Sequence, residues 1–222
     1  MIKVPATSAG VAAFEQLITE GLNVNITLMF SQSHVEAVFA AYIRGLQQRL
    51  ENGLSVTGIK AVAIVFMSRV DTLVDKLLQQ QGSDEALVLR GQAAVAMAKR
   101  AYQYYQWLFN GDAFAPLRAA GALPQYLLWA STGTKNPAYS DVLYVEELIG
   151  PETVNTAPDA TLAAFRDHGE STARLLQDHD EANAVLARLA ELGVDMQAVG
   201  EQLQLEGLQL FDEAFEKLLS LT

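Results

Sequence analysis

The sequence predicts an α/β protein with a parallel sheet, because short apolar segments alternate with longer segments of helical periodicity. No hairpin signal joins neighbouring apolar segments, so we expect βαβ units. The stretch 61–67 (Ala-Val-Ala-Ile-Val-Phe-Met) is apolar almost throughout. This is typical of a strand covered on both faces, as in a parallel sheet.

Strands are expected over 2–6, 24–30, 61–67, 125–131 and 152–157. After the first, helical spacing of apolar residues predicts a helix over 8–21 that ends at Gly21. The further helices are expected from Ser31 or Ser33 to about 52–53, over 70–110 with a break near 82–83, and from the fifth strand to Thr222. The stretch 131–141 is expected to be a loop. Five βα units do not close an eight-stranded barrel, and an open doubly wound sheet needs no more, so the pattern leaves both folds open.

Composition limits the classes of function. The 222 residues are 50% hydrophobic, which suffices for one sizeable core. A net charge of −11 repels phosphate backbones and anionic membranes, so we expect neither nucleic acid nor membrane as a partner. Cysteine is absent, which excludes disulfides and thiolate chemistry and fits a cytoplasmic protein. The three histidines show no metal-ligand spacing, and no metal is expected.

Polar residues gather where the predicted strands end, and parallel α/β folds place active sites at the C-terminal ends of strands. Lys3 lies in the otherwise apolar first strand. The others, in chain order, are Asn25 and Thr27, Ser68-Arg69, Ser131 with Lys135-Asn136, and Asn155-Thr156.

Each of these groups admits two interpretations. In an apolar strand Lys3 would lose hydration, which favours the neutral amine that attacks carbonyl groups; alternatively its ammonium group reaches solvent, and the pattern alone favours this second interpretation. Arg69 and Lys135 could bind a phosphate together or form ordinary surface ion pairs. Asn25 and Thr27 could orient a water or a substrate hydroxyl, or serve as local caps.

At these residues the sequence resembles the transaldolase family, in particular the bacterial subgroup found alone or fused to glucose-6-phosphate isomerase. The segments that carry the resemblance are 2–7 (Ile-Lys-Val-Pro-Ala-Thr), 21–31, 68–71 (Ser-Arg-Val-Asp), 128–141 and 153–158. The match runs essentially from end to end. It makes the first interpretation of Lys3, an amine that attacks carbonyl groups, the favoured one.

The resemblance implies a (β/α)8 barrel of which 1–222 forms the C-terminal portion, with about five of the eight units and no separate second domain. It implies transfer of a dihydroxyacetone unit, in the pentose phosphate pathway, from sedoheptulose 7-phosphate or fructose 6-phosphate to an aldose phosphate. Lys3 matches the Schiff-base lysine, and Asn25 and Thr27 match a pair that places the catalytic water and the imine. No cofactor is implied, because the imine itself polarises the substrate.

Arg69 matches a phosphate-binding arginine, and Ser131, Lys135 and Asn136 fall where the family makes further phosphate contacts. Two departures stand out. The family has three strands before its lysine strand, which carry an acid/base aspartate, a Thr-Ser-Asn-Pro-like segment and a glutamate, whereas this sequence starts at the lysine strand. In addition, Ile64 stands where the family usually has a serine.

We therefore expect two open sheet edges, poor solubility, and pairing with another chain. Either a homo-oligomer or a complementing N-terminal segment could satisfy the edges. Besides a transaldolase, the chain could be a catalytically impaired barrel fragment that binds sugar phosphates. A helical interaction module ranks last, because a scaffold does not need polar residues at five strand ends.

Overall fold

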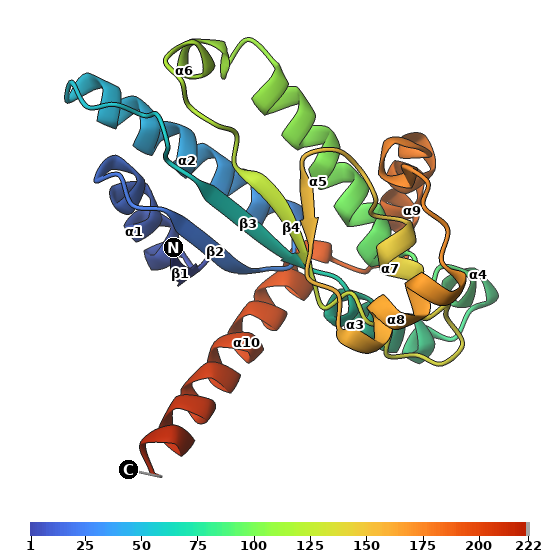
Figure 1. The fold of residues 1–222 in the computed structure, drawn as a ribbon. Helices are drawn as coiled ribbons and strands as arrows, with labels where there is room; N and C mark the ends of the chain where they lie inside the picture. Colours follow the sequence, from blue (N-terminus) through green and yellow to red (C-terminus); the bar gives the residue numbers. More distant parts are fainter. Residues whose placement is uncertain (221–222) are drawn as a thin grey trace.

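The computed structural model describes residues 1–220, which form a five-stranded parallel sheet with its strands in chain order (Figure 1). The strands are β1 (Ile2–Pro5), β2 (Val24–Met29), β3 (Ala61–Phe66), β4 (Tyr126–Ala130) and β5 (Thr153–Asn155). All five predicted strands are thus confirmed, with ends that differ by one or two residues. The terminal strands β1 and β5 each pair with a single neighbour in the described chain, so both edges are open there.

The helices are α1 (Ser8–Thr19), α2 (Gln32–Glu51), α3 (Ser68–Gln81), α4 (Asp84–Val88), α5 (Ala93–Asn110), α6 (Ala115–Ala119), α7 (Leu143–Glu146), α8 (Asp159–His168), the 3₁₀ turn η1 (Arg174–Leu176), α9 (His179–Glu191) and α10 (Met196–Leu219). Ser31 caps α2 by accepting from the backbone of His34, as expected. The stretch 70–110 breaks near Gly82, as predicted, and again at Gly91. The predicted end of the last helix at Thr222 lies outside the described residues.

Strand order decides between the two folds that the pattern left open. The order β1-β2-β3-β4-β5 never reverses. Because crossovers between parallel strands are right-handed, winding in one direction places every connecting helix on the same face, whereas a doubly wound sheet needs a reversal. Figure 1 shows α1, α2 and α5 alongside one face of the sheet. The sheet is therefore wound as in part of a (β/α)8 barrel.

The two faces of the sheet are packed differently. On the helix side, strand residues such as Ile26, Ala63 and Trp129 join the main apolar core together with α1, α2 and α5. On the opposite face, a small separate cluster contains Ile64, Leu128 and Ala130. The expectation of strands covered on both faces is thus met fully on one side and only by this small cluster on the other.

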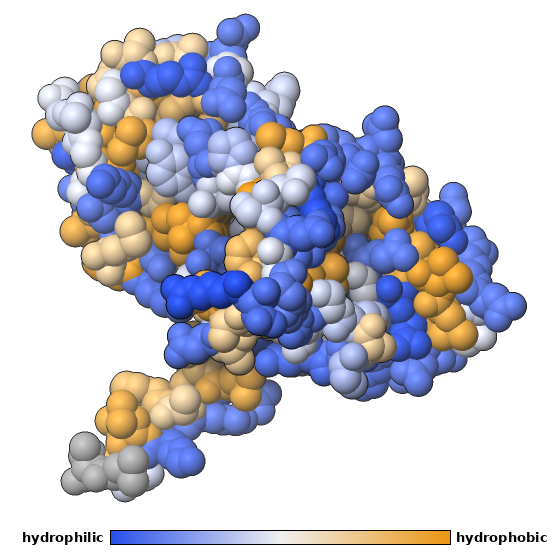
Figure 2. Space-filling model, turned by 45° about the vertical axis from the view of Figure 1, so that its right-hand side comes forward, coloured by the Kyte–Doolittle hydropathy of each residue, from blue (hydrophilic) through white to orange (hydrophobic). Residues whose placement is uncertain are grey.

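Helix α10 crosses the C-terminal ends of the strands and then leaves the body of the molecule (Figure 1). Gly200 packs on Ser31 and Gly207 on Leu28, where a larger side chain would collide with the strand end. Beyond that point the helix exposes Phe215, Leu218 and other large apolar residues. Figure 2 shows apolar side chains gathered along the projecting helix. None of the helices within residues 1–220 combines the length and apolar character that crossing a membrane requires.

Candidate functional site

Lys3, Asn25 and Thr27 lie together on the sheet face opposite the main core. Lys3 pairs with Asn25 across the β1–β2 ladder, and Pro5 pairs with Thr27. Paired residues share a face, and residues two apart on a strand share a face as well. Since Ile26, between them, points into the helix-side core, the three polar side chains lie on the other side.

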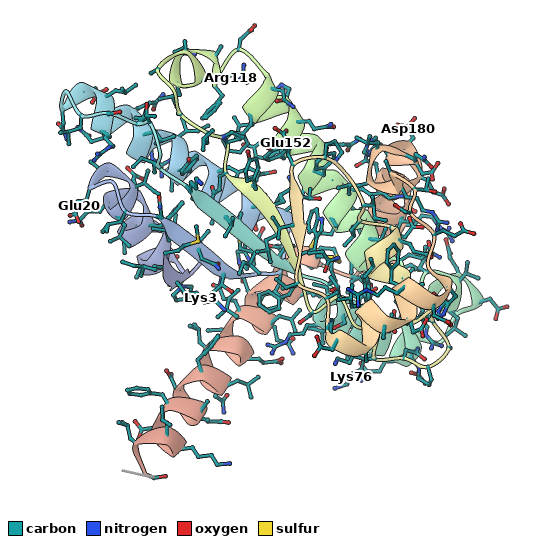
Figure 3. The ribbon with its side chains drawn as sticks, in the orientation of Figure 1. Lys3, Glu20, Lys76, Arg118, Glu152 and Asp180 are labelled. Atoms are coloured by element: carbon teal, nitrogen blue, oxygen red, sulfur yellow. The ribbon has the colours of Figure 1, made fainter. Side chains whose placement is uncertain are left out.

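The predicted burial of Lys3 is not found: its side chain is exposed in the described chain. The physical reason is its place in β1, the edge strand, where one flank of the residue meets solvent. Its Nζ lies 5.9 Å from the centroid of the Phe211 ring on α10. Figure 3 shows Lys3 between the sheet edge and this helix.

The partners of Lys3 carry buried polar atoms without a hydrogen-bond partner. Asn25 Oδ1 and Thr27 Oγ1 are both in this state among the described residues, and Thr27 is only 2% exposed. An unsatisfied buried group costs about 1–3 kcal/mol, so such groups point to a ligand or a functional role. Leu28, next along β2, has a φ of 62°, and the ladder with β3 shifts register there. Backbone strain of this kind concentrates at functional sites.

A second group forms where β3 and β4 end. The backbone nitrogen of Ser68 donates to the backbone oxygen of Ser131 over 3.0 Å, which joins the start of α3 to the loop after β4. Arg69 and Lys135 line the same cavity of about 480 Å³, together with the exposed Lys76. The structure thus brings together the two cations that the sequence analysis paired.

This cavity has the features of an anion site. Ser68 lines it, and the Oγ of Ser68 is buried without a hydrogen-bond partner among the described residues. Ser68 and Arg69 open the 14-residue helix α3, whose dipole favours a negative charge at this end. The Arg69 guanidinium lies 5.6 Å from the centroid of the Phe66 ring, which holds it at the end of β3.

The other two predicted phosphate contacts lie beside this cavity. Asn136 and Lys135 line an adjacent cavity of about 210 Å³. The Oδ1 of Asn136 accepts from the backbone nitrogen of Ala138, so its amide nitrogen is the group left to contact an anion. Ser131 is half-buried, with a φ of 54° at the end of β4.

Helix α10 connects the two groups, which the sequence analysis did not foresee. Gln204 Nε2 donates to the backbone oxygens of Ala6 (2.9 Å) and Leu28 (3.0 Å), at the ends of β1 and β2. Gln202 and Glu206, on the same helix, line the cavity of Arg69 and Lys135. No local pattern marks one glutamine of this helix for such a contact.

Two aspartates on α3 were also missed. Asp71 accepts from Tyr144 Oη (2.7 Å), and Asp75 accepts from Tyr139 Oη (2.5 Å). Burial raises the pKa of Asp71 to about 6, against hydrogen bonds that lower it. A signal was present, because Asp71 occupies a core position at helical spacing with Val74 and Leu78. Within residues 1–220, no cluster of three or more acidic or histidine side chains is placed to hold a metal ion.

Comparison with known proteins shows the family of this chain. The family model described as Transaldolase/Fructose-6-phosphate aldolase matches residues 1–222. Similar proteins include the transaldolases of Thiobacillus denitrificans (56% identical over 99% of this chain and 61% of that protein), Neisseria gonorrhoeae (51%, over 99% and 61%) and Mycolicibacterium smegmatis (46%, over 100% and 60%). The chain therefore spans about three-fifths of the length of these relatives. Since the family model covers the whole chain, the chain belongs to the transaldolase/fructose-6-phosphate aldolase family.

Proposed function

We propose that this chain supplies the Schiff-base lysine and the phosphate-binding residues of a transaldolase. Lys3 is the nucleophile, and the reaction moves a dihydroxyacetone unit from a ketose phosphate to an aldose phosphate. The observation that carries the proposal is the placement of Lys3 directly beside Asn25 and Thr27, whose buried oxygens have no partner among the described residues. Family membership supports the same assignment.

The chemistry suits these residue types. The neutral amine of Lys3 attacks the ketose carbonyl, and water leaves to give an iminium ion. The iminium accepts the electron pair as the carbon–carbon bond breaks, which leaves an enamine on Lys3 and frees the first aldehyde. The enamine then attacks the acceptor aldehyde, and hydrolysis releases the new ketose. Thr27 Oγ1 is suited to hold the water of the hydrolytic step, and Asn25 Oδ1 to accept a hydrogen bond from the N–H of the iminium ion or from a substrate hydroxyl.

The phosphate group of either substrate would lie in the cavity of Ser68, Arg69 and Lys135. The chain carries a net charge of −11, so only a local basic cluster can hold such an anion. Arg69 offers a planar fork and Lys135 a point charge, and the unpartnered Ser68 hydroxyl adds a donor. Ser131 and Asn136 would make outer contacts with the same group.

A second candidate function rests on the exposure of Lys3 and the open edge of β1. Water that reaches an exposed lysine hydrolyses a reactive imine there, which an enclosed site prevents. By itself, the chain would then bind sugar phosphates with little turnover, and full activity would need a complementing segment or a second copy along β1. We further propose that the complete enzyme acts in the cytoplasm and in the pentose phosphate pathway, with sugar phosphates rather than nucleic acids or membranes as its partners.

Borohydride trapping tests the nucleophile. The chain is mixed with fructose 6-phosphate and with the part of the Thiobacillus denitrificans relative that it does not match, reduced, digested and analysed by mass spectrometry. We expect the adduct on Lys3, and we expect Lys3→Met to abolish it. Lys60→Met is the matched control, because Lys60 is exposed at the opposite ends of the strands. An adduct on Lys135 with Lys3 unmodified would reject the assignment.

A further inference from the structure

Helix α3 carries two aspartates one turn apart, and each holds a tyrosine from the segment that follows β4. Tyr139 Oη donates to Asp75 Oδ2 over 2.5 Å, and Tyr144 Oη donates to Asp71 Oδ2 over 2.7 Å. Tyr139 lies 64 residues after Asp75 in the chain, and Tyr144 lies 73 residues after Asp71. The two tyrosine–aspartate pairs therefore fasten both ends of segment 139–144 to one helix.

Both carboxylates are fixed from their other side as well. Asp71 Oδ1 accepts from the backbone nitrogen of Ala94, and Asp75 Oδ1 from that of Gly91, each over 2.8 Å. Gly91 has a φ of 73°, and a Cβ there would lie 2.7 Å from the Tyr139 ring, so only glycine fits this position without a shift. With both oxygens of each carboxylate engaged, neither aspartate can rotate without losing a hydrogen bond.

The same helix presents the phosphate-binding residues. Ser68 and Arg69 stand at its start, and Lys135 lies four residues before Tyr139. A turn joins Lys135 to Tyr139, in which the backbone nitrogen of Tyr139 donates to the backbone oxygen of Asn136 over 3.1 Å. Lys135, Asn136, Ser68 and all four members of the pairs line one cavity of about 210 Å³, and Lys135 also lines the larger cavity of Arg69.

We propose that Asp71, Asp75, Tyr139 and Tyr144 are positioning residues that hold Lys135 beside Arg69 and Asn136 in the adjacent cavity, and that they thereby set the affinity of the site for phosphate. The inference rests on the proposed function, in which the larger cavity of Ser68, Arg69 and Lys135 receives the substrate phosphate. Its physical basis is the entropy of ordering: a free loop must be ordered when the anion binds, whereas a loop already fastened to α3 has lost that freedom on folding.

In the pair of Tyr139 and Asp75, the tyrosine hydroxyl remains a hydrogen-bond donor over a wide pH range. Burial and the hydrogen bond to Asp75 raise the pKa of Tyr139 to about 12, so its hydroxyl keeps its proton at neutral pH. The ring of Tyr139 is half-buried against Gly91. The change Tyr139→Phe therefore removes the hydrogen bond and leaves the ring contact in place.

The experiment is a titration with inorganic phosphate, followed by NMR, of the 222-residue chain combined with the part of the Thiobacillus denitrificans relative that it does not match. We expect Tyr139→Phe to weaken phosphate binding about 5-fold, the factor that corresponds to one ordinary hydrogen bond, and Tyr144→Phe to weaken it by a similar factor. Tyr104→Phe is the matched control and should bind as the parent chain does, because Tyr104 packs on Phe39 and Trp107 away from the cavity. Amide exchange over residues 133–138 should become faster in Tyr139→Phe.

A second test asks whether Tyr139 acts through Lys135. If it does, the effects of Tyr139→Phe and Lys135→Ala on phosphate binding are coupled, whereas a merely structural role would leave them independent. In the Lys135→Ala background, Tyr139→Phe should weaken phosphate binding by much less than 5-fold. An undiminished effect in that background would overturn the inference, as would equal phosphate affinities of Tyr139→Phe and the parent chain. If instead the parent chain binds no phosphate, or Arg69→Ala binds it equally well, the proposed phosphate site itself fails. These outcomes separate failure of the positioning role from failure of the proposed function.

Discussion

Lys3 and Asn25 are direct neighbours across the β1–β2 ladder, with both side chains on the face away from the main core. Thr27 follows on the same face, and its hydroxyl is buried without a partner among the described residues. Asn25 Oδ1 is buried without a partner among these residues as well. Neither group adds to the stability of the fold, because each unsatisfied polar atom costs free energy. Stability and activity should therefore respond in opposite ways when they are removed.

Thr27→Val tests this opposition. The change keeps the shape of the side chain and removes the unpartnered hydroxyl, so we expect the free energy of unfolding to stay equal or to rise by about 1 kcal/mol. Trapping of fructose 6-phosphate on Lys3 in the completed barrel should fall at least tenfold. Thr132→Val is the matched control: Thr132 is also fully buried but donates to Asn155 Oδ1 over 2.8 Å, so its loss should destabilise the chain by about 1–3 kcal/mol. Equal responses of the two variants in denaturant melts would contradict the assignment.

The buried carboxyl of Asp71 gives a prediction on pH. Its pKa is about 6 in the folded chain against an ordinary value of 3.8, so between these values the folded state binds the proton more tightly than the unfolded state. By linkage, its contribution to the free energy of unfolding falls as pH rises from about 4 to about 6. The free energy of unfolding of the parent chain minus that of Asp71→Asn should be larger at pH 4 than at pH 7, by about 2–3 kcal/mol. Denaturant melts at both pH values check this, and parallel curves for the two proteins would refute it.

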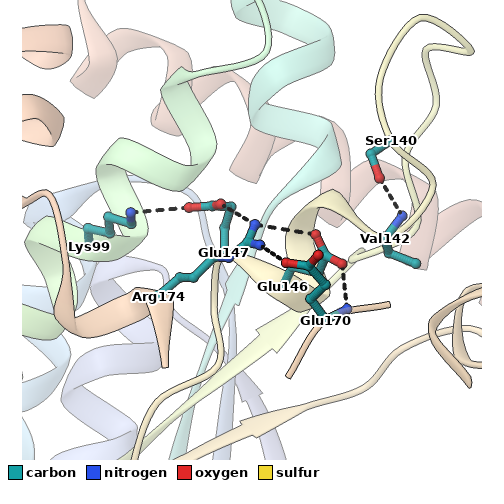
Figure 4. A network of polar contacts seen from close by, with 7 residues as sticks. All are labelled: Lys99, Ser140, Val142, Glu146, Glu147, Glu170 and Arg174. Atoms are coloured by element: carbon teal, nitrogen blue, oxygen red, sulfur yellow. Dashed lines mark hydrogen bonds and ion pairs between the residues drawn. The ribbon is translucent and has the colours of Figure 1, made fainter. Parts of the chain in front are cut away.

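A charged network joins α5 to the segments around α7 and η1 (Figure 4). Removing its basic or its acidic member should have unequal effects on stability. Lys99 is almost fully buried, and its Nζ lies 3.1 Å from Glu147 Oε2. Arg174 also pairs with Glu147, over 3.2 Å, and with two further glutamates. Glu147→Leu leaves Lys99 buried without its acidic partner and should cost about 3–5 kcal/mol. Lys99→Met should cost only about 1 kcal/mol, because Glu147 keeps Arg174.

The double variant Lys99→Met/Glu147→Leu provides the control for that pair. It should be more stable than Glu147→Leu alone, since the buried charge is gone together with its partner. Thermal melts of the three variants measure the order. A larger loss of stability for Lys99→Met than for Glu147→Leu would contradict this prediction, because the burial of Lys99 would then not determine the cost.

The open edges and the projecting helix predict poor solubility of the isolated chain. Phe215 and Leu218 are 59% and 60% exposed on α10, and β1 is an unpaired edge in the described chain. The double change Phe215→Glu/Leu218→Glu should raise the soluble, monodisperse fraction in light scattering. Leu203→Glu, on the same helix but 5% exposed, should instead destabilise the chain. A parent chain that is already a monodisperse, cooperatively melting monomer would contradict this prediction.

Much of the fold and half of the site follow from local pattern. The strand at 61–67 and the capped start of α2 at Ser31 could be predicted because apolar spacing and capping depend on neighbours in sequence. The common face of Asn25 and Thr27 follows from the period of two in a strand. The pairing of Arg69 with Lys135 needed only the rule that parallel strands end at one edge of the sheet.

The sequence by itself thus determined the five strands, the longer helices between them, their order, and which chemical groups reach the C-terminal ends of the strands. Only the tertiary structure decided that Lys3 is exposed at an edge, that Tyr139 is held by Asp75, and that Gln204 spans the ends of β1 and β2. The physical reason is distance along the chain. Periodicity and capping act over a few residues, whereas these three features depend on strand order and on contacts 64 to 198 residues apart, which exist only once the sheet has wound and α10 has crossed it.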